Sequence, residues 1–308
     1  MWTTPAPFGN VPTVRRNHAA ALVGTTMVMY GGMDEMGNPL DDLLALNMET
    51  MRWFTPRIHK SCTVRPGKRH SLCMIPVYNY GVLKQFNFDI FHVPTIHDDT
   101  ISRNNSGLYM FGGINKAGKA SNDLFVLKPK KIDYKDDDYY LKWTQPEVAG
   151  IPPEPRYSYC AALRGKYIAF FGGRNDEMHA GGLAVRDIAL LNVEIMRWET
   201  VLGQGMSPAG RWGASMAAFH TKMVVFGGMR INKYCSGKIV IAETDPQVVK
   251  EQEAELKYIQ NVRETMGRNA FERMNRAALV GLRTLRSPRE TMSSLVALPP
   301  IGRRSDEG

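Results

Sequence analysis

Apolar residues along the chain gather into short runs that each end in a pair of glycines. The runs are rich in aromatic, β-branched and methionine residues, and each is too short for a helix, so they predict β-strands. Four of them occur, MVMYGG at 27–32, LYMFGG at 108–113, IAFFGG at 168–173 and MVVFGG at 223–228. Their recurrence predicts a repeat architecture.

The four runs have similar neighbours. Upstream stands an arginine followed by small or polar residues, at Arg16, Arg69, Arg156 and Arg211. Downstream, three runs continue to a second apolar strand and a tryptophan. A glycine pair lets a strand turn without a Cβ clash and leaves room for a large side chain. A single sheet of this kind cannot bury both faces, so the repeats are expected to stack on one another.

These glycine pairs, leading arginines and following tryptophans resemble the kelch family over residues 16–242. The resemblance implies an all-β, kelch-type β-propeller with four recognisable blades. It also implies structural roles for the glycine pairs and the tryptophans, which are Gly31, Gly32, Trp53, Gly112, Gly113, Trp143, Gly172, Gly173, Trp198, Gly227 and Gly228.

Kelch propellers usually have six or seven blades, so three arrangements stay open. The N-terminal strand with Trp2 can close the ring, because the fourth repeat has no tryptophan of its own. Alternatively, the chain is an open arc that a partner completes, or a fragment of a longer product. The second repeat carries a surplus at 77–104, for which we consider a binding loop, a poorly packed excursion or translated non-coding sequence.

From Pro246 the pattern changes to that of a helix. Apolar residues recur at three- and four-residue steps, with arginines on the opposite side. We therefore expect a propeller over 1–245, an amphipathic basic α-helix over 246–287 and a disordered tail over 288–308. The apolar side of the helix either packs on the propeller or docks to another protein.

The formal charge of +9 belongs mainly to this C-terminal segment, where ten basic residues stand against three acidic ones between Lys257 and Arg304. A basic tail on a nearly neutral body argues against a nucleic-acid track. We find no secretory signal or membrane-length apolar run and expect a cytoplasmic protein, with the cytoskeleton as a candidate site of association. The four cysteines are expected to be reduced thiols.

Motifs for catalysis are absent from the sequence, including the nucleophile elbow, the zinc-protease helix and the phosphate-binding glycine loops. We expect no enzymatic activity, no cofactor and no metal. His92 and His97 lie close to Asp98 and Asp99, where a flexible polar loop is favoured over a metal site. His18 and His70 follow repeat arginines and are expected to be structural.

The sequence therefore predicts a protein–protein interaction scaffold or adaptor, with a partner that is acidic or part of a larger assembly. The alternative is a substrate-selecting or regulatory kelch part of a phosphatase or ubiquitin-ligase system. For the repeat arginines we favour structural ties between blades over binding of acidic peptides. Candidate partner-binding residues lie in the loops after the glycine pairs and on the basic helix: Asp34, Glu35, Asn115, Lys116, Arg174, Asn175, Met229, Arg230, Arg268, Arg273 and Arg276.

Overall fold

The computed structural model of the chain divides after Thr244 into two compact units, residues 1–244 and 245–308. The structure describes residues 2–78, 103–131, 139–177, 183–200, 208–231 and 234–244, together with Ala254, Lys257 and Asn261. These three isolated residues are helical. The rest of the helix predicted over 246–287, with its three arginines, and the tail lie outside the described residues.

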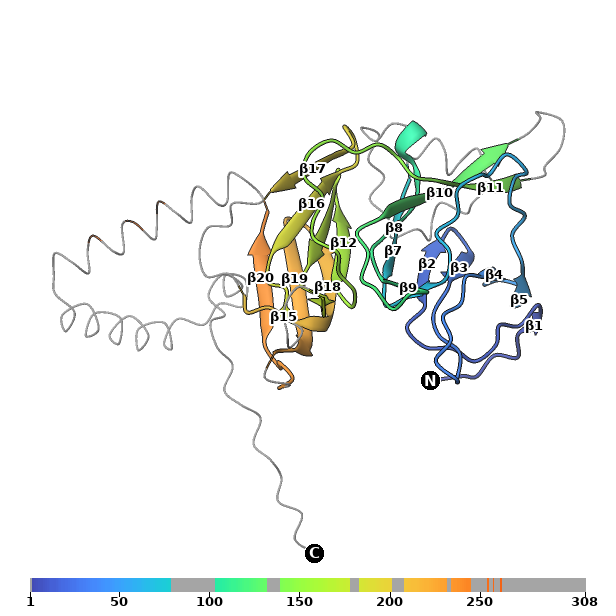
Figure 1. Cartoon of the computed structure of the whole chain (residues 1–308), viewed down its shortest axis with the longest axis horizontal. Coiled ribbons are helices and arrows are strands. Elements are labelled where there is room, and N and C mark those ends of the chain that lie inside the picture. The colour runs from blue at the N-terminus through green and yellow to red at the C-terminus, as the bar shows by residue number, and fades with distance from the viewer. Residues whose placement is uncertain are drawn as a thin grey trace, which may run out of the picture. The chain divides into compact units, whose positions relative to one another are not determined.

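The first unit is an all-β propeller whose described strands form four blades (Figure 1). Blade 1 has the strand order β1-β5-β4-β3-β2. Its strands are β1 (Phe8–Gly9), β2 (Ala19–Val23), β3 (Thr26–Tyr30), β4 (Leu43–Asn47) and β5 (Arg52–Phe54). Strand β1 is short and runs parallel to β5, whereas the other neighbours are antiparallel.

Blades 2 and 3 have four antiparallel strands each. Blade 2 consists of β7 (Cys73–Val77), β8 (Gly107–Phe111), β10 (Leu124–Lys131) and β11 (Tyr139–Thr144). Blade 3 consists of β12 (Cys160–Arg164), β13 (Tyr167–Phe171), β16 (Ile188–Asn192) and β17 (Arg197–Thr200). Two small sheets pair β6 (Arg69–His70) with β9 (Ile114–Asn115), and β14 (Arg174–Asn175) with β15 (Leu183–Ala184).

Blade 4 has three described strands, β18 (Trp212–Phe219), β19 (Lys222–Met229) and β20 (Ile239–Glu243). The N-terminal residues do not complete it. Trp2 is fully exposed, at 101% of its reference area, and β1 pairs within blade 1. Among the described residues, ring closure through Trp2 is therefore absent, which leaves blade 4 without a tryptophan strand.

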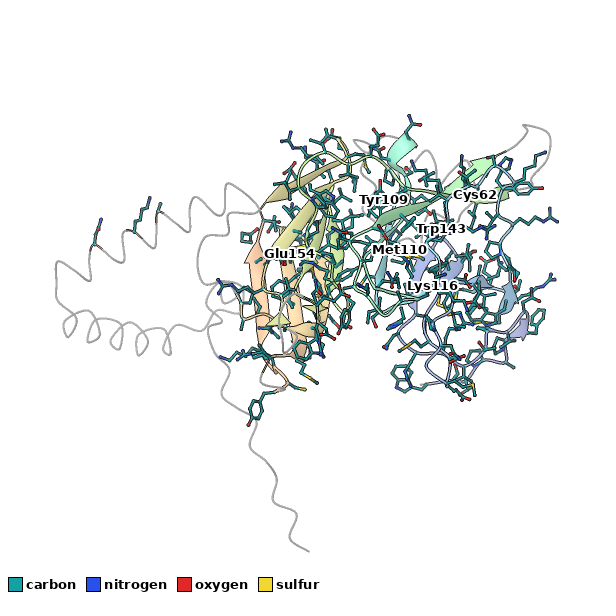
Figure 2. All side chains as sticks on the ribbon, in the orientation of Figure 1. Cys62, Tyr109, Met110, Lys116, Trp143 and Glu154 are labelled. Carbon is teal, nitrogen blue, oxygen red and sulfur yellow. The ribbon has the colours of Figure 1, made fainter. Side chains whose placement is uncertain are left out.

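Each blade packs on the next through its first long strand, in the order β2, β7, β12 and β18. The core between blades 1 and 2 includes Trp143, which Figure 2 labels. Its ring centroid lies 5.2 Å from that of Tyr30. Between blades 2 and 3, Trp198 packs on Phe111 at 5.3 Å. The tryptophan of a blade thus packs against an aromatic ring of the preceding blade.

The second repeat departs from its predicted loops at one point. Val77 and Tyr78 are buried, and Val77 belongs to the core between blades 2 and 3. The surplus placed at 77–104 therefore begins too early, because β7 runs through Val77. Residues 79–102 lie outside the described residues. The mixed-charge segment at 128–140 lies at the end of a long hairpin in which Lys131 pairs with Tyr139.

The repeat arginines are buried and hold the glycine turns. In each blade a guanidinium Nη1 donates to the carbonyl oxygen of the first glycine of the pair, at 3.1 to 3.3 Å. The donors are Arg15, Arg69, Arg156 and Arg211. The equivalent residue in blade 1 is thus Arg15, and its prediction as Arg16 is wrong by one position. Structural ties, rather than open peptide-binding groups, describe these arginines.

Three of these arginines also bond to a carboxylate that precedes the third strand of the blade. Arg15 makes a two-point contact with Asp42, at 2.6 and 2.8 Å, and Arg156 with Asp187, at 2.5 and 2.8 Å. Arg69 lies 3.6 Å from Asp123. In blade 4 the residue directly before the third strand is Lys238, and Arg211 instead donates to Ser236 Oγ at 3.3 Å.

Backbone hydrogen bonds continue these ties from blade to blade. The amide of the second glycine donates to the carbonyl of the next repeat arginine, as in Gly32 to Arg69 at 3.0 Å. A second series joins residues with positive φ, each two positions after a repeat arginine. In this series Ser71 donates to Asn17, Ser158 to Ser71 and Gly213 to Ser158, at 2.7 to 2.8 Å.

Replacing Arg156 tests the guanidinium tie. Arg156→Met should lower the free energy of unfolding by about 3 kcal/mol, because it orphans the buried Gly172 carbonyl and removes the bonds to Asp187. Arg156→Lys should also destabilise, since an ammonium cannot make the two-point contact. Urea denaturation would measure both. Arg186→Ala, at an exposed neighbour, should shift stability by about 0.5 kcal/mol or less. Equal losses at Arg156 and Arg186 would contradict this role.

Alanine substitutions at two glycines distinguish the cost of a strained backbone from the cost of a clash between blades. Gly172 and Gly227 have similar φ, +69° and +76°, so alanine costs roughly 1–2 kcal/mol at either one. At Gly172, however, a Cβ would meet the Arg211 carbonyl oxygen at 2.3 Å, whereas at Gly227 the nearest atom is 4.0 Å away. Gly172→Ala should therefore lower the denaturation midpoint clearly more than Gly227→Ala. Equal shifts would show that blade contact is not limiting.

Candidate partner-binding face

One row of side chains comes from the residue that follows each repeat arginine. These residues are Arg16, His70, Tyr157 and Trp212. Each pairs with the residue after the glycine pair of its own blade, namely Met33, Ile114, Arg174 and Met229. The next residue of each blade belongs to the blade-to-blade hydrogen-bonded series, so the four side chains stand in sequence along the arc. We call this set the axial row.

The loops that follow the axial row are closed by their own polar side chains. Asp34 accepts from the Asn38 amide at 2.7 Å and from Asn38 Nδ2 at 2.9 Å. These hydrogen bonds lower the pKa of Asp34. Asn115 Oδ1 accepts from the amides of Ala117 and Lys119, at 2.9 and 3.2 Å. Such side-chain turns fix a loop locally.

Blade 3 follows the same pattern, because Asn175 Oδ1 accepts from the Glu177 amide at 3.1 Å. Three of the predicted binding residues, Asp34, Asn115 and Asn175, thus close their own loops. Glu35 and Lys116 are exposed at the loop tips. A neighbouring pair, Lys119 and Glu177, links the loops of blades 2 and 3 at 3.5 Å.

A compact polar cluster joins blades 3 and 4 at this face. The Tyr157 hydroxyl donates to Asp176 Oδ2 at 2.6 Å, and Arg174 Nε donates to Asp176 Oδ1. The Arg174 guanidinium lies over the Trp212 ring, 5.3 Å from its centroid. Burial, aided by the bond to Asp176, raises the pKa of Tyr157 to about 12, so its hydroxyl stays protonated and donates.

Blade 4 brings two arginines close together, Arg211 and Arg230, and has no aspartate before its third strand. Arg211 donates from Nε to Ala209 and from Nη1 to Gly227 and Ser236. Its pKa is lowered, chiefly by burial and further by the positive charge of Arg230. Blade 4 therefore holds positive charge that no described carboxylate neutralises in the way Asp187 does for Arg156.

The predicted loop residues do share one face, yet sequence reasoning missed the aromatic part of it. Tyr157 and Trp212 were overlooked, although aligning the repeats on the arginine marks both positions. The replacement of the aspartate in the fourth repeat, where Lys238 stands at the position of Asp187, was equally visible in the sequence. Arg268, Arg273 and Arg276 lie outside the described residues.

Histidines and cysteines offer no catalytic grouping within the described ranges. Burial lowers the pKa of His18 and of His70, each with a smaller contribution from a nearby arginine. His92 and His97 fall outside these ranges. Among the described residues, no three His, Cys, Asp or Glu side chains gather closely enough to hold a metal ion. No helix in this part of the chain is long and apolar enough to cross a membrane.

The four cysteines are free thiols that differ in burial. Burial raises the pKa of Cys160 to about 12, whereas Cys235 is exposed. At pH 8, iodoacetamide should therefore modify Cys235 rapidly and leave Cys160 unmodified until the blade unfolds. Peptide mass mapping with and without urea would show this, with Cys235→Ser as the control. Modification of Cys160 in the folded protein would contradict the packing between blades 3 and 4.

Comparison with known proteins identifies the class. The KLHDC2/KLHL20/DRC7 Kelch-repeats domain matches residues 92–255, and the chain therefore belongs to the kelch-repeat family. The resemblance drawn from the glycine pairs and tryptophans is confirmed, as is a kelch propeller with four detected blades.

Several curated proteins are similar to this chain. Human Kelch domain-containing protein 3 is 25% identical over 233 residues, which cover 73% of this chain and 50% of that protein. A probable serine/threonine-protein kinase of Dictyostelium discoideum is 32% identical over 221 residues, 71% of this chain and 13% of the kinase. Acyl-CoA-binding domain-containing protein 5 of Arabidopsis thaliana is 25% identical over 280 residues, 78% and 40% respectively. The chain thus spans half or less of these relatives.

Proposed function

We propose that the propeller is a non-enzymatic adaptor that binds an acidic segment of a protein partner at the axial row and its adjoining loops. Kelch propellers typically bind proteins, and this face combines aromatic and cationic side chains on a rigid base. Binding residues on loops that are locked by their own hydrogen bonds lose little conformational entropy when a partner docks.

The charge of blade 4 carries the proposal. The charge of Arg230 lies close enough to Arg211 to lower its pKa, and blade 4 has Lys238 at the position where the other blades have an aspartate. A partner carboxylate at Arg230 would supply the missing negative charge, while the buried Arg211 keeps its hydrogen bonds within the blade. The adjacent Trp212 offers an indole surface for an apolar residue of the same segment.

The basic segment at 246–287 has a separate, weaker place in the proposal. Its arginines Arg268, Arg273 and Arg276 remain predicted contacts to an acidic surface, on the basis of the sequence alone. Such exposed contacts are strongly screened by salt. The proposal does not depend on these predicted arginine contacts.

Selection from a random peptide library against the full chain tests this function. Selected peptides should be enriched in Asp or Glu, and Arg230→Ala should weaken their binding about tenfold or more. Binding should also weaken as ionic strength rises. Arg186→Ala, an exposed arginine elsewhere on blade 3, is the matched control and should bind like the parent. Thermal unfolding should be the same for all three proteins.

Two results would refute the acidic-segment proposal. One is a selected peptide set without enrichment of acidic residues. The other is equal affinity of the parent, Arg230→Ala and Arg186→Ala for the selected peptides. Binding that is lost together with thermal stability would instead assign Arg230 to folding.

A second candidate is the regulatory or substrate-selecting part of an enzyme system such as a phosphatase or ubiquitin ligase. The match to a small part of a probable kinase supports this candidate, because it shows similar kelch sequence within a much larger polypeptide. Transcript mapping across both ends of the coding sequence tests it. A continuous reading frame that encodes an enzyme domain would favour this candidate over an independent adaptor.

A further inference from the structure

Blade 4 presents an apolar face that resembles the buried faces of the other blades. In blades 1 to 3, one face packs on the following blade, and we call it the leading face. In blade 4 the same repeat positions are occupied by Ser215, Ala217, Val224, Phe226, Ile239 and Ile241, which we call the blade 4 leading face.

Exposure separates this face from its counterparts. Phe226 is 54% exposed, whereas Tyr30, Phe111 and Phe171 at the same repeat position are 2%, 1% and 1% exposed. Ile239 and Ile241 are exposed as well. The register places Phe226 opposite Ile239 and Val224 opposite Ile241, so these side chains form one continuous patch. An apolar sheet face of this kind is typical of a docking surface.

Blade 4 also lacks a described strand at its outer edge. No described strand pairs with the outer edge of β20 (Figure 1). In blades 1 to 3 that position holds a strand whose tryptophan lies opposite a leucine, in the pairs Trp53 with Leu46, Trp143 with Leu127 and Trp198 with Leu191. The corresponding residue of β20 is Ala242, whose small side chain leaves room for an indole.

Trp2 has the sequence context of such a strand. Six residues separate Trp2 from Gly9, and six also separate Trp143 from Gly150. Pro12 and Arg15 then follow Gly9 at the same distances in sequence at which Pro153 and Arg156 follow Gly150. The pairing agrees, because Phe8 lies opposite Arg52 as Ala149 lies opposite Arg197. Trp2 is therefore related to blade 1 as Trp143 is to blade 3, and it has the position of a tryptophan from a preceding blade.

The backbone at the two ends of the arc is complementary. At each interior interface, the earlier blade contributes a glycine amide and a positive-φ carbonyl, and the later blade an arginine carbonyl and a positive-φ amide. On blade 4 the corresponding groups are the Gly228 amide and the Gly213 carbonyl. On blade 1 they are the Arg15 carbonyl and the Asn17 amide. No described blade follows blade 4 or precedes blade 1.

We propose that blade 4 is completed by a second copy of this chain. The Trp2 segment of the second copy adds to the edge of β20, with Trp2 opposite Ala242, and blade 1 of that copy covers the blade 4 leading face. One position of the second copy satisfies both contacts, because the linker from Trp2 to Arg15 has the length found between consecutive blades. The contact is head-to-tail, joining different surfaces of the two copies.

Sedimentation of the full chain over a range of concentrations tests the association. We expect a dimer or a concentration-dependent series, weakened roughly tenfold or more by Phe226→Asp and by Trp2→Ala. Both residues are exposed, so the blade itself should stay folded. Ile195→Asp is the matched control, since Ile195 is also exposed, at 59%, but lies outside the proposed contact. A monomer at all concentrations, or equal weakening by the control, overturns the proposal.

Cysteine cross-linking tests the register and the source of the added strand. The pairing of Glu199 with Leu190 in blade 3 predicts that Thr3 lies opposite Ile241. In a Cys235→Ser background, Thr3→Cys with Ile241→Cys should form a disulfide-linked dimer on oxidation. Thr3→Cys with Ala242→Cys, which places the thiols on opposite faces of the sheet, should not, and neither should either single variant.

Two further outcomes would overturn this inference. A disulfide within one chain would show that Trp2 completes its own blade 4, so that the ring closes without a second copy. A monomeric full chain that associates after truncation at Thr244 would show that the C-terminal segment covers the blade 4 leading face. Absence of any cross-link in the Thr3→Cys/Ile241→Cys protein also counts against the proposal.

Discussion

A buried guanidinium in each repeat is the contact on which the propeller depends. The glycine pair turns the chain through two positive-φ residues, and the first glycine carbonyl then points into the blade, where only a long donor can reach it. The arginine supplies that donor. Its own backbone carbonyl accepts the amide of the second glycine from the preceding blade. One residue therefore fixes the turn within a blade and joins that blade to its neighbour.

This arrangement explains why the glycines and the arginine recur together. A Cβ on the first glycine of an interior pair would collide with the arginine carbonyl of the next blade, at 2.3 to 2.6 Å. Loss of the arginine would leave a buried carbonyl without a donor, which costs about 1–3 kcal/mol. The tryptophans add contact area between blades, whereas the guanidinium and the glycine amides determine their relative placement.

Much of the fold was predictable because its determinants are local. Gly-Gly runs, leading arginines and tryptophans mark each blade within a short stretch of sequence. The choice of Arg16 over Arg15 was an error that the sequence could have prevented, because Arg15 precedes Gly31 by the same 16 residues by which Arg156 precedes Gly172. The partner-binding residues remain predictions. Asp34, Asn115 and Asn175 were assigned to partner contact although asparagine and aspartate at such positions commonly close turns. Ring closure depends on contacts between the ends of the arc, and local sequence does not encode these contacts.

The positive-φ series from Asn17 to Gly213 has a consequence for how such a protein can diversify. Its hydrogen bonds run from backbone to backbone, so neighbouring blades are aligned whatever side chains stand beside them. The side chains of the axial row are therefore not needed to align the blades. An arginine, a histidine, a tyrosine and a tryptophan occupy four equivalent positions without disturbing the arc. Substitutions at these positions can therefore change the chemistry of this face one residue at a time while the backbone arrangement is kept.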